Sequence, residues 1–407
     1  MDTPGEKPFR IPRQPLPRNV RLLGWASFLN DVASEMVFPL LPQFLATLLD
    51  ANRAYLGTML GMIEGLADSV ASLVKLASGG WSDRVGSRKG FVVFGYGIAA
   101  VVRPLIGLLM TPWQLLAVRL GDRVGKGIRT SPRDALIAET TAAEIHGRAF
   151  GFQRAMDHLG AMIGPLLAAA FLAAWPGRFR PLFLLTLLPG LLVVALLALG
   201  LRERRAAPIS TEKLSWTLKP FGPGFRLYLV ALVVFTLGNS SDAFLLVRAG
   251  EVDVPAALIP LLWCAFHVVK SGGNYIVGHA VDRIGPRPMI LAGWALYGAV
   301  YLAFALCTQA WQVWALLAGY GLFYALTEPA EKTLVASLAG SRERGLAYGW
   351  FNLAVSVATF PANLIFGFLY DRHGPLAAFG WGAAMAAAAA AIFIFVRVKD
   401  ATGGPRS

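Results

Sequence analysis

The chain has 407 residues, of which 56% are hydrophobic and only 15% are charged. Soluble globular domains usually carry about 25% charged residues, so this composition excludes an ordinary soluble fold and predicts a membrane protein with many spans. The formal net charge is +13, but Lys and Arg lie in short segments between apolar runs. That placement favours anchoring to an anionic lipid surface over nucleic-acid binding.

Twelve apolar runs are each long enough for a helix that crosses a bilayer, which takes about 20 residues. The runs occupy 22–49, 55–79, 89–110, 113–138, 148–175, 180–201, 225–249, 255–278, 288–307, 311–337, 345–370 and 375–396. No strand-like alternation interrupts them, so we expect an all-α membrane protein. The longest polar segment, 202–224, separates two blocks of six runs and is the expected linker between two halves.

The connecting segments alternate in charge. Lys and Arg are concentrated in one set of segments, which comprises 1–21, 82–90, 202–224, 282–287, 340–345 and 397–407. By the positive-inside rule this set faces the cytoplasm, so both termini are expected inside. We therefore expect a multi-pass protein of the cytoplasmic (inner) membrane of a bacterium. Its predicted order is a tail (1–21), a six-helix half (22–201), a linker (202–224), a second six-helix half (225–396) and a tail (397–407).

The polar, Pro-rich first twenty residues have no apolar core, so we expect no cleaved signal peptide. Cys264 and Cys307 are the two cysteines, and both lie in or at the end of apolar runs. They offer neither a disulfide framework nor metal-ligand spacing, and we expect no metal site.

Two loops share one pattern. GGWSDRVGSRK begins at Gly79 and GHAVDRIGPRP begins at Gly278, and both read G-x-x-x-D-R-x-G-x-R. Such self-similarity predicts two halves of like topology. Glycine permits a tight turn, and an Asp at a helix end can pair with Arg or accept N–H bonds. We expect these loops to hold helices together in one state and release them in another; ordinary glycine turns are the alternative.

GGWSDRVGSRK resembles the loop signature of the major facilitator superfamily, G-x-x-x-D-R-x-G-R-R/K, with Ser87 in place of the first basic residue. The resemblance covers nearly the whole chain. It implies a transporter whose two six-helix halves alternate between inward and outward access, with a cytoplasmic gating motif. The gating residues it implies are Gly79, Asp83, Arg84, Gly86 and Arg88, and in the second copy Gly278, Asp282, Arg283, Gly285 and Arg287.

A second resemblance lies in the fifth run. Gly151, Gly160, Gly164 and Pro165 have the spacing of the antiporter motif of the same superfamily, with alanines in place of its last two glycines. This resemblance implies export by antiport. The alternative is a small-residue packing seam with a proline kink.

The apolar runs contain charged residues. A buried ion costs several kcal/mol unless it is paired or hydrated, so these residues indicate a hydrated centre. In the resembled fold, spans 1, 4, 7 and 10 line a central cavity and spans 3, 6, 9 and 12 face lipid. The substrate-cavity candidates are Asn30, Arg119, Arg123, Asp157, His158, Asn239, Asp242, His267, Glu328 and Glu331.

The stretch GDRVGKGIRTSPRD, residues 121–134, places several basic residues at helical spacing in the fourth run. We expect Arg119 and Arg123 to reach the cavity, and Lys126, Arg129 and Arg133 to act mainly in latching and anchoring at the cytoplasmic end. The alternative is a set of salt-bridged structural arginines. Acidic and basic residues roughly balance within the membrane, so the sequence leaves the charge of the cargo open.

A carboxylate at mid-depth can take up and release a proton during a transport cycle. The proton-coupling candidates are Asp31, Glu35, Glu64, Asp68 and Asp122. Asp31 and Glu35 come first, because they lie one helical turn apart on one face. Each could instead pair with an arginine of the fourth run and have only a structural role.

These patterns predict a secondary active transporter that moves a small organic solute by alternating access. Proton-coupled export is the first hypothesis and proton-coupled uptake the second. We find no P-loop, no G-x-S-x-G and no H-E-x-x-H, so we do not expect an enzyme, and a channel fits the repeat less well. We expect no cofactor, a proton gradient as the driving force, and a monomer that contacts substrate, protons and the lipid bilayer.

Overall fold

The computed structural model describes residues 15–142, 145–203, 217–339 and 344–396, which are helical and contain no strand. The first group of helices comprises α1 (Arg18–Glu35), η1 (Phe38–Leu40), α2 (Leu41–Leu49), η2 (Asp50–Tyr55), α3 (Leu56–Val85), α4 (Lys89–Val102), η3 (Arg103–Leu108), α5 (Pro112–Glu139), α6 (His146–Ala174), α7 (Phe179–Leu185) and α8 (Leu187–Gly200). The second group comprises α9 (Pro223–Gly238), α10 (Ala243–Glu251), α11 (Ile259–Ile284), α12 (Pro286–Leu306), α13 (Ala310–Leu338) and α14 (Arg344–Phe393).

Each predicted run is occupied by helix, but several runs are broken. The run 22–49 consists of α1, η1 and α2, because Pro39 and Pro42 lack the N–H that a continuous helix would need. The run 225–249 is interrupted between α9 and α10 at the polar residues 239–242. Both halves therefore begin with a discontinuous helix, which transporters use to build sites at mid-membrane. The runs 345–370 and 375–396 form α14, whose backbone turns at Gly374 with φ of 78°.

The helix bounds differ from the predicted segment boundaries. α1 begins at Arg18, inside the predicted tail, and α9 begins at Pro223, inside the predicted linker. A proline at position 17 and another at 223 explain these starts, because proline is tolerated at the first turn of a helix. The segments 1–14, 204–216 and 397–407 lie outside the described residues.

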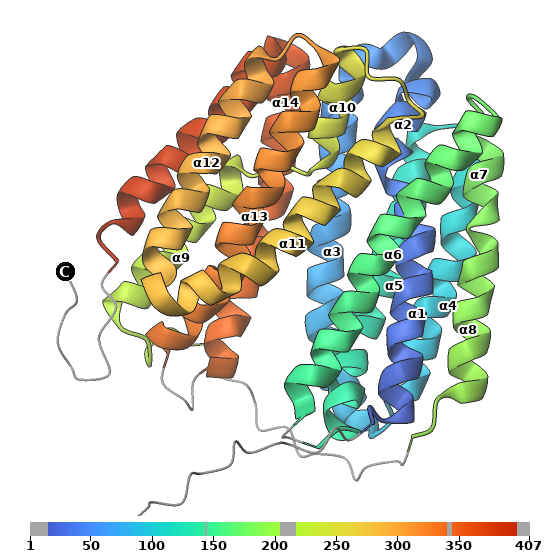
Figure 1. The fold of residues 1–407 in the computed structure, drawn as a ribbon, viewed down its shortest axis with the longest axis vertical. Helices are drawn as coiled ribbons and strands as arrows, with labels where there is room; N and C mark the ends of the chain where they lie inside the picture. The colour runs from blue at the N-terminus through green and yellow to red at the C-terminus, as the bar shows by residue number, and fades with distance from the viewer. Residues whose placement is uncertain (1–14, 143–144, 204–216, 340–343, 397–407) are drawn as a thin grey trace, which may run out of the picture.

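The helices pack into two bundles that follow the chain order. In the first bundle α1 packs against α6 and α8, and α5 against α3 and α4; in the second, α13 packs against α11 and α12, and α14 against α9 and α12. The bundles meet along two lines, α3 against α14 and α6 against α11 (Figure 1). Helices from both bundles thus surround the centre.

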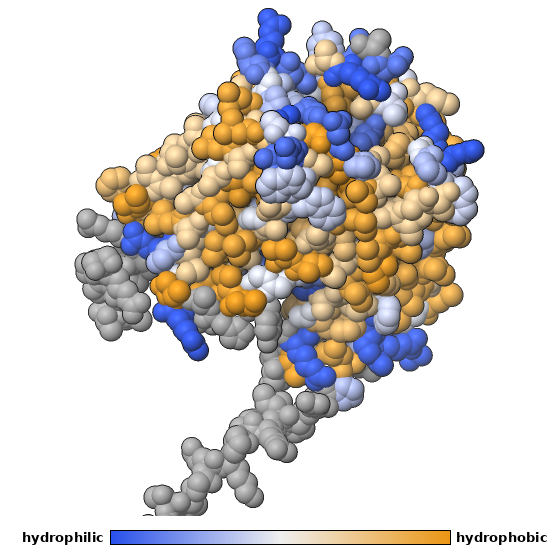
Figure 2. Space-filling model, turned by 45° about the horizontal axis from the view of Figure 1, so that its top comes forward, coloured by the Kyte–Doolittle hydropathy of each residue, from blue (hydrophilic) through white to orange (hydrophobic). Residues whose placement is uncertain are grey.

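Seven helical segments in the described ranges are long and apolar enough to cross a membrane. The helices α3, α5, α11 and α13 are not among them, because they carry the charged and polar side chains described below. The side of the molecule forms an apolar belt, with hydrophilic residues at its two ends (Figure 2). Large exposed side chains such as Phe94 on α4, Leu199 on α8 and Leu306 on α12 belong to this lipid-facing surface.

The two ends of the molecule differ in packing. We call the end where α1 begins and α8 ends the terminal face, and the end where α2 and α10 end the distal face (Figure 1). Near the distal face α3 and α14 touch closely, since a Cβ at Gly61 would overlap the carbonyl oxygen of Asn363. The Ser69 hydroxyl donates to the Ser356 carbonyl oxygen at 3.1 Å. Beyond that bond, toward the terminal face, the two helices separate and a pocket opens between them.

Candidate functional site

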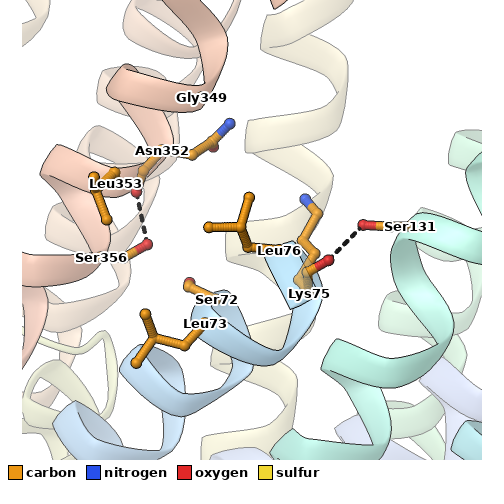
Figure 3. Close-up of a pocket in the computed structure, with 9 residues that line it drawn as sticks. All are labelled: Ser72, Leu73, Lys75, Leu76, Ser131, Gly349, Asn352, Leu353 and Ser356. Atoms are coloured by element: carbon orange, nitrogen blue, oxygen red, sulfur yellow. Dashed lines mark hydrogen bonds between the residues drawn. The ribbon is translucent and has the colours of Figure 1, made fainter. Parts of the chain in front are cut away.

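A polar cavity lies between the halves and reaches toward the terminal face. Its deepest pocket has a volume of about 310 Å³. A second pocket, also of about 310 Å³, shares Asp68 and Lys126 with the first. A third, of about 160 Å³, shares Ser72, Lys75 and Ser356 with the second (Figure 3). The three pockets form one path along α3 and α14, which we call the central cavity.

A separate pocket of about 420 Å³, which we call the side pocket, lies where α6 faces α11 and α13. Its lining is dominated by ionisable side chains. The lining residues are Arg154, His158, Lys270, Asn274, Glu328, Glu331, Lys332 and Phe351. Both pockets are therefore lined by the two halves together, as a binding site in an alternating-access protein requires.

A buried ion pair joins α3 to α5 beside the central cavity. Arg119 donates from Nε and Nη2 to the Glu64 carboxylate at 2.7–3.0 Å, and the two residues are 4% and 1% exposed. One turn further along α5, Arg123 Nε lies 3.2 Å from Asp68 Oδ1. These arginines neutralise carboxylates of their own half, which is the structural alternative stated above. Arg123 also lines the deepest pocket, as expected, whereas Arg119 does not.

Asp122 and Asn30 are held inside the first half by a third arginine. Arg103 donates to Asp122 Oδ1 at 2.8 Å and to the Asn30 main-chain oxygen at 3.2 Å. Asp122 is 3% exposed and does not line the pockets described above. A carboxylate fixed in a buried pair has little freedom to exchange protons, so we give Asp122 a structural role.

Asp31 and Glu35 lie where α1 crosses α6 at close range. A Cβ at Gly160 would stand 2.9 Å from Asp31 Cβ, and a Cβ at Gly164 would stand 3.0 Å from Glu35 Cβ. Glycine at these two positions therefore permits the helices to approach at the level of the two carboxylates. Glu35 also accepts a bond of 2.7 Å from Trp263 Nε1 of the other half.

The remaining residues of the antiporter-like motif differ in environment. A Cβ at Gly151 would meet nothing within 4 Å, so this position is not part of the close contact. Pro165 lies inside α6. Asp157, one turn before Gly160 on the same helix, accepts a bond of 2.6 Å from Gln153.

The second half contributes a carboxylate to the deepest pocket. Asp242, in the break between α9 and α10, accepts bonds from the hydroxyls of Tyr320 at 2.7 Å and Tyr324 at 3.1 Å. Asn239, in the same break, also lines this pocket. The discontinuous helix thus delivers polar groups to mid-bundle, as in the first half.

The other predicted cavity residues divide between the side pocket and the core. Glu328 accepts bonds from Lys270 at 2.8 Å and Asn274 at 2.9 Å, and Glu331 lines the same pocket. His267 lies against two aromatic rings of its own helix and lines neither the central cavity nor the side pocket. The structure therefore places this half-buried imidazole outside both pockets.

Sequence similarity to known transporters extends over nearly the whole chain. The profile of the Major Facilitator Superfamily matches residues 23–249 and 227–407. The chain belongs to the major facilitator superfamily. It is 31% identical to an uncharacterised MFS-type transporter of Methanocaldococcus jannaschii, over 94% of this chain and 95% of that protein. It is 26% identical to the multidrug resistance protein MdtG of Citrobacter koseri, over 82% of this chain and 83% of that protein.

A solved structure supports the fold of this superfamily member. The D-xylose-proton symporter matches with a TM-score of 0.73 at 17% identity, over 95% of this chain and 99% of that chain. The predicted fold class, an all-α membrane protein of the major facilitator type, is confirmed, and the described helices are consistent with two halves of six spans. The protein is a multi-pass membrane transporter of the major facilitator superfamily.

The gating motif of the superfamily adopts glycine turns in both copies. Gly86 ends α3 with φ of 63°, and Gly285 ends α11 with φ of 92°, a left-handed region that favours glycine. Arg88 forms an ion pair of 2.8 Å with Glu139 at the end of α5. Arg287 donates to a main-chain carbonyl just after α14 at 3.0 Å. Both loops therefore connect neighbouring helices at the terminal face.

The other positions of the gating motif make fewer contacts with neighbouring helices. A Cβ at Gly79 would lie 3.3 Å from Ser131 Cβ on α5, and the side chains of Arg84 and Arg283 are exposed. The side chains of Asp83 and Asp282, and the surroundings of Gly278, lie outside the described residues.

Sequence reasoning missed a third copy of the G-x-x-x-D-R-x-G pattern, at the distal face. The sequence beginning at Gly367 reads G-x-x-x-D-R-x-G and ends at Gly374, which also has positive φ. Asp371 of this copy accepts bonds from the backbone N–H groups of Gly57 at 2.7 Å and Thr58 at 2.6 Å. It therefore joins the second half to the first turn of α3. A search for the loop pattern in the remaining connections would have found it.

Two lysines also differ from expectation. Lys126, which we assigned mainly to latching, lines the two inner pockets of the central cavity. Lys75, which sequence reasoning did not select, lines the two outer ones, and its side chain projects from α3 between the walls formed by α5 and α14 (Figure 3). Lys75 follows Asp68 by seven residues, and Lys126 follows Arg119 by seven residues. Residues seven apart lie on the same face of a helix, so this spacing was the available signal in the sequence.

Proposed function

We propose that this transporter exports a small organic solute in exchange for protons, as a monomer in the cytoplasmic membrane of a bacterium. The observation that carries the proposal is the close contact of Gly160 and Gly164 with α1 at Asp31 and Glu35. Movement of α6 against α1 would change the surroundings of both carboxylates. A proton taken up or released there would in turn favour one packing of the two helices over the other.

The arrangement of the halves supports alternating access. The central cavity opens toward the terminal face, whereas α3 and α14 touch near the distal face. The basic loops between helices lie at the terminal face, which we therefore assign to the cytoplasm. In this orientation the structure is the inward-open state, ready to receive solute from the cell.

We assign the proton step to Asp31 and Glu35 rather than to the acids that are paired with arginine. Glu64 and Asp122 are held by arginines, and Asp68 faces Arg123. Asp31 accepts a single amide bond, from Asn30 at 2.9 Å, and no arginine or lysine lies within 4.0 Å of it among the described side chains. It is thus the carboxylate best placed to alternate between its protonated and ionised forms.

Luminal pH in proteoliposomes tests the coupling. Purified protein is reconstituted without a pH gradient, and candidate solutes are added outside. Antiport moves a proton out for solute in, so the lumen becomes alkaline; symport acidifies it. The sign does not depend on the orientation of the inserted protein. Alkalinisation that is absent from empty liposomes supports export by antiport, whereas acidification would establish the uptake alternative.

A further inference from the structure

The basic residues of the central cavity indicate the class of solute. We infer that the cavity binds an organic anion, whose acidic group lies between Lys75 and Lys126 and whose apolar part extends toward mid-bundle. The inference rests on the proposed transport function, because it concerns the same cavity, and it adds the charge of the cargo, which the sequence left open.

The carboxylates of the first-half wall are already neutralised. Glu64 bonds Arg119 through both of its oxygens. Asp68, the acid closest along α3 to Lys75, lies 3.2 Å from Arg123. A cationic solute would have to displace Arg119 to reach Glu64, and a buried partner left unpaired costs several kcal/mol. The Asp68 side chain is 45% exposed, but the guanidinium of Arg123 beside it offsets its charge.

The two cavity lysines, in contrast to these carboxylates, have no partner of opposite charge among the described side chains. Lys75 on α3 and Lys126 on α5 line the same pocket of about 310 Å³, and both side chains are exposed to it. Among the described side chains no carboxylate lies within 4.0 Å of either ammonium group. Two like charges that face one small pocket repel each other, and a bound anion removes this repulsion and satisfies both ammonium groups.

The rest of this pocket suits an acidic group. The hydroxyl-bearing Ser72 on α3 lies beside the lysines in its lining, whereas the Thr130 hydroxyl on α5 already donates to the Lys126 main-chain oxygen at 2.6 Å. In the side pocket three basic side chains face the two acidic ones, Glu328 and Glu331, so its ionisable groups leave a net positive charge between the halves. A carboxylate, phosphonate or sulfonate needs several N–H or O–H donors at once, which this set supplies.

The neighbouring deep pocket offers a few apolar contacts within a largely polar lining. Phe38, Tyr324 and Val355 provide them, whereas the rest of the lining is polar or charged and includes the Asp242 carboxylate, whose bonds come from tyrosine hydroxyls. The two connected pockets, each of about 310 Å³, match the size of small-molecule sites. An amphipathic acid with one or two rings would place its charge at the lysines and its rings against these side chains.

Binding to the purified protein tests the inference without transport. The probes are phenyl, naphthyl and anthracenyl compounds, each carrying a carboxylate, a carboxamide or an aminomethyl group, so that charge changes while the ring does not. We expect the carboxylates to raise the melting temperature and the matched amines to leave it unchanged, because a ligand that binds the folded state stabilises it by mass action. Isothermal titration then gives the dissociation constants.

Lysine variants distinguish binding at the cavity lysines from a general effect of the positive charge of the protein. Lys75→Gln with Lys126→Gln should weaken carboxylate binding at least about tenfold, since each charge-assisted bond contributes more than one factor of ten. Lys219→Gln removes the same charge at an exposed site outside the cavity and should leave binding unchanged. Each cavity variant is first checked for an unaltered melting temperature without ligand; a single Lys126→Gln replaces the double variant if that fails.

Three results would overturn the inference: amines that stabilise as much as carboxylates, a double variant that binds carboxylates normally, or no stabilisation by any carboxylate. Failure here is distinguishable from failure of the antiport proposal. Proton-coupled exchange of an amine would leave antiport standing and remove the anion. Carboxylate binding at the lysines without any change of luminal pH would support the anion inference and contradict the antiport proposal.

Discussion

Asp371 offers a direct test of how the distal face is held closed. Its carboxylate accepts two backbone N–H groups at the start of α3, which belongs to the other half. Replacement by Ala removes both bonds in the inward-open state and none in an outward-open state, where the halves have separated. We therefore expect Asp371→Ala to shift the population toward the outward-open state.

The size of the shift follows from the two bonds. A hydrogen bond to a charged group contributes about 1.5–3 kcal/mol, so two would sum to about 3–6 kcal/mol if nothing replaced them. Asp371 is only half-buried, so water replaces part of this energy. We expect a net shift of about 1–3 kcal/mol, or about 5–150-fold in the ratio of the two states. Asp371→Asn keeps an acceptor but loses the charge, and its shift should be smaller.

Cysteine labelling from the two sides of the membrane measures this ratio. Cys264 and Cys307 are first replaced by serine, and Thr359, which lines the two inner pockets of the central cavity, is replaced by cysteine. A membrane-impermeant thiol reagent reaches this cysteine from the distal face only when that face is open. We expect its labelling rate from that side to rise about 5–150-fold in Asp371→Ala. Arg372→Gln, a change at the exposed neighbouring residue, is the control. An unchanged rate from the distal side would refute the assignment of Asp371 to closure.

Three further changes test other parts of the structure. Gly61→Ala should prevent close contact at the distal face and raise distal labelling, whereas Gly97→Ala, with nothing within 4 Å of a new Cβ, should have no such effect; equal behaviour would contradict the packing argument. Arg119→Met should lower the melting temperature by leaving a buried carboxylate unpaired, a loss of about 3–5 kcal/mol, and adding Glu64→Leu should restore most of it; no recovery in the double variant would mean that the pair has another role. Asp31→Asn should abolish proton-driven transport in proteoliposomes but permit solute exchange, and uphill transport at the normal rate would remove this residue from coupling.

The sequence was a good guide to what depends on local composition. Apolarity located the helices, and the G-x-x-x-D-R-x-G-x-R loops identified the two halves. The proline-induced breaks at Pro39 and Pro42 could also have been read locally. By contrast, the partner of each charge depends on which helix lies opposite, which one chain does not reveal. Arg119 and Lys126 are about two helical turns apart on α5. Arg119 forms an ion pair with Glu64, whereas Lys126 faces the cavity.

The same limit applies to the carboxylates. Asp122 and Asp31 looked alike in the sequence, because both lie at mid-depth in a charged run. The structure separates them through Arg103, a residue of the third span that was expected to face lipid and instead points inward. An intramembrane arginine on an otherwise apolar helix was the available signal, since such a residue requires a buried partner.

The contact between Gly61 and Asn363 joins main chain to main chain rather than side chain to side chain. Side chains can adjust through rotamer changes, but two backbones at this distance have one fit and lose it together when the helices part. The outer seal should therefore break in a single step instead of loosening gradually. A transporter with such a seal has few intermediate states in which both faces admit water, and this would suppress the leakage of protons that dissipates the gradient between productive cycles.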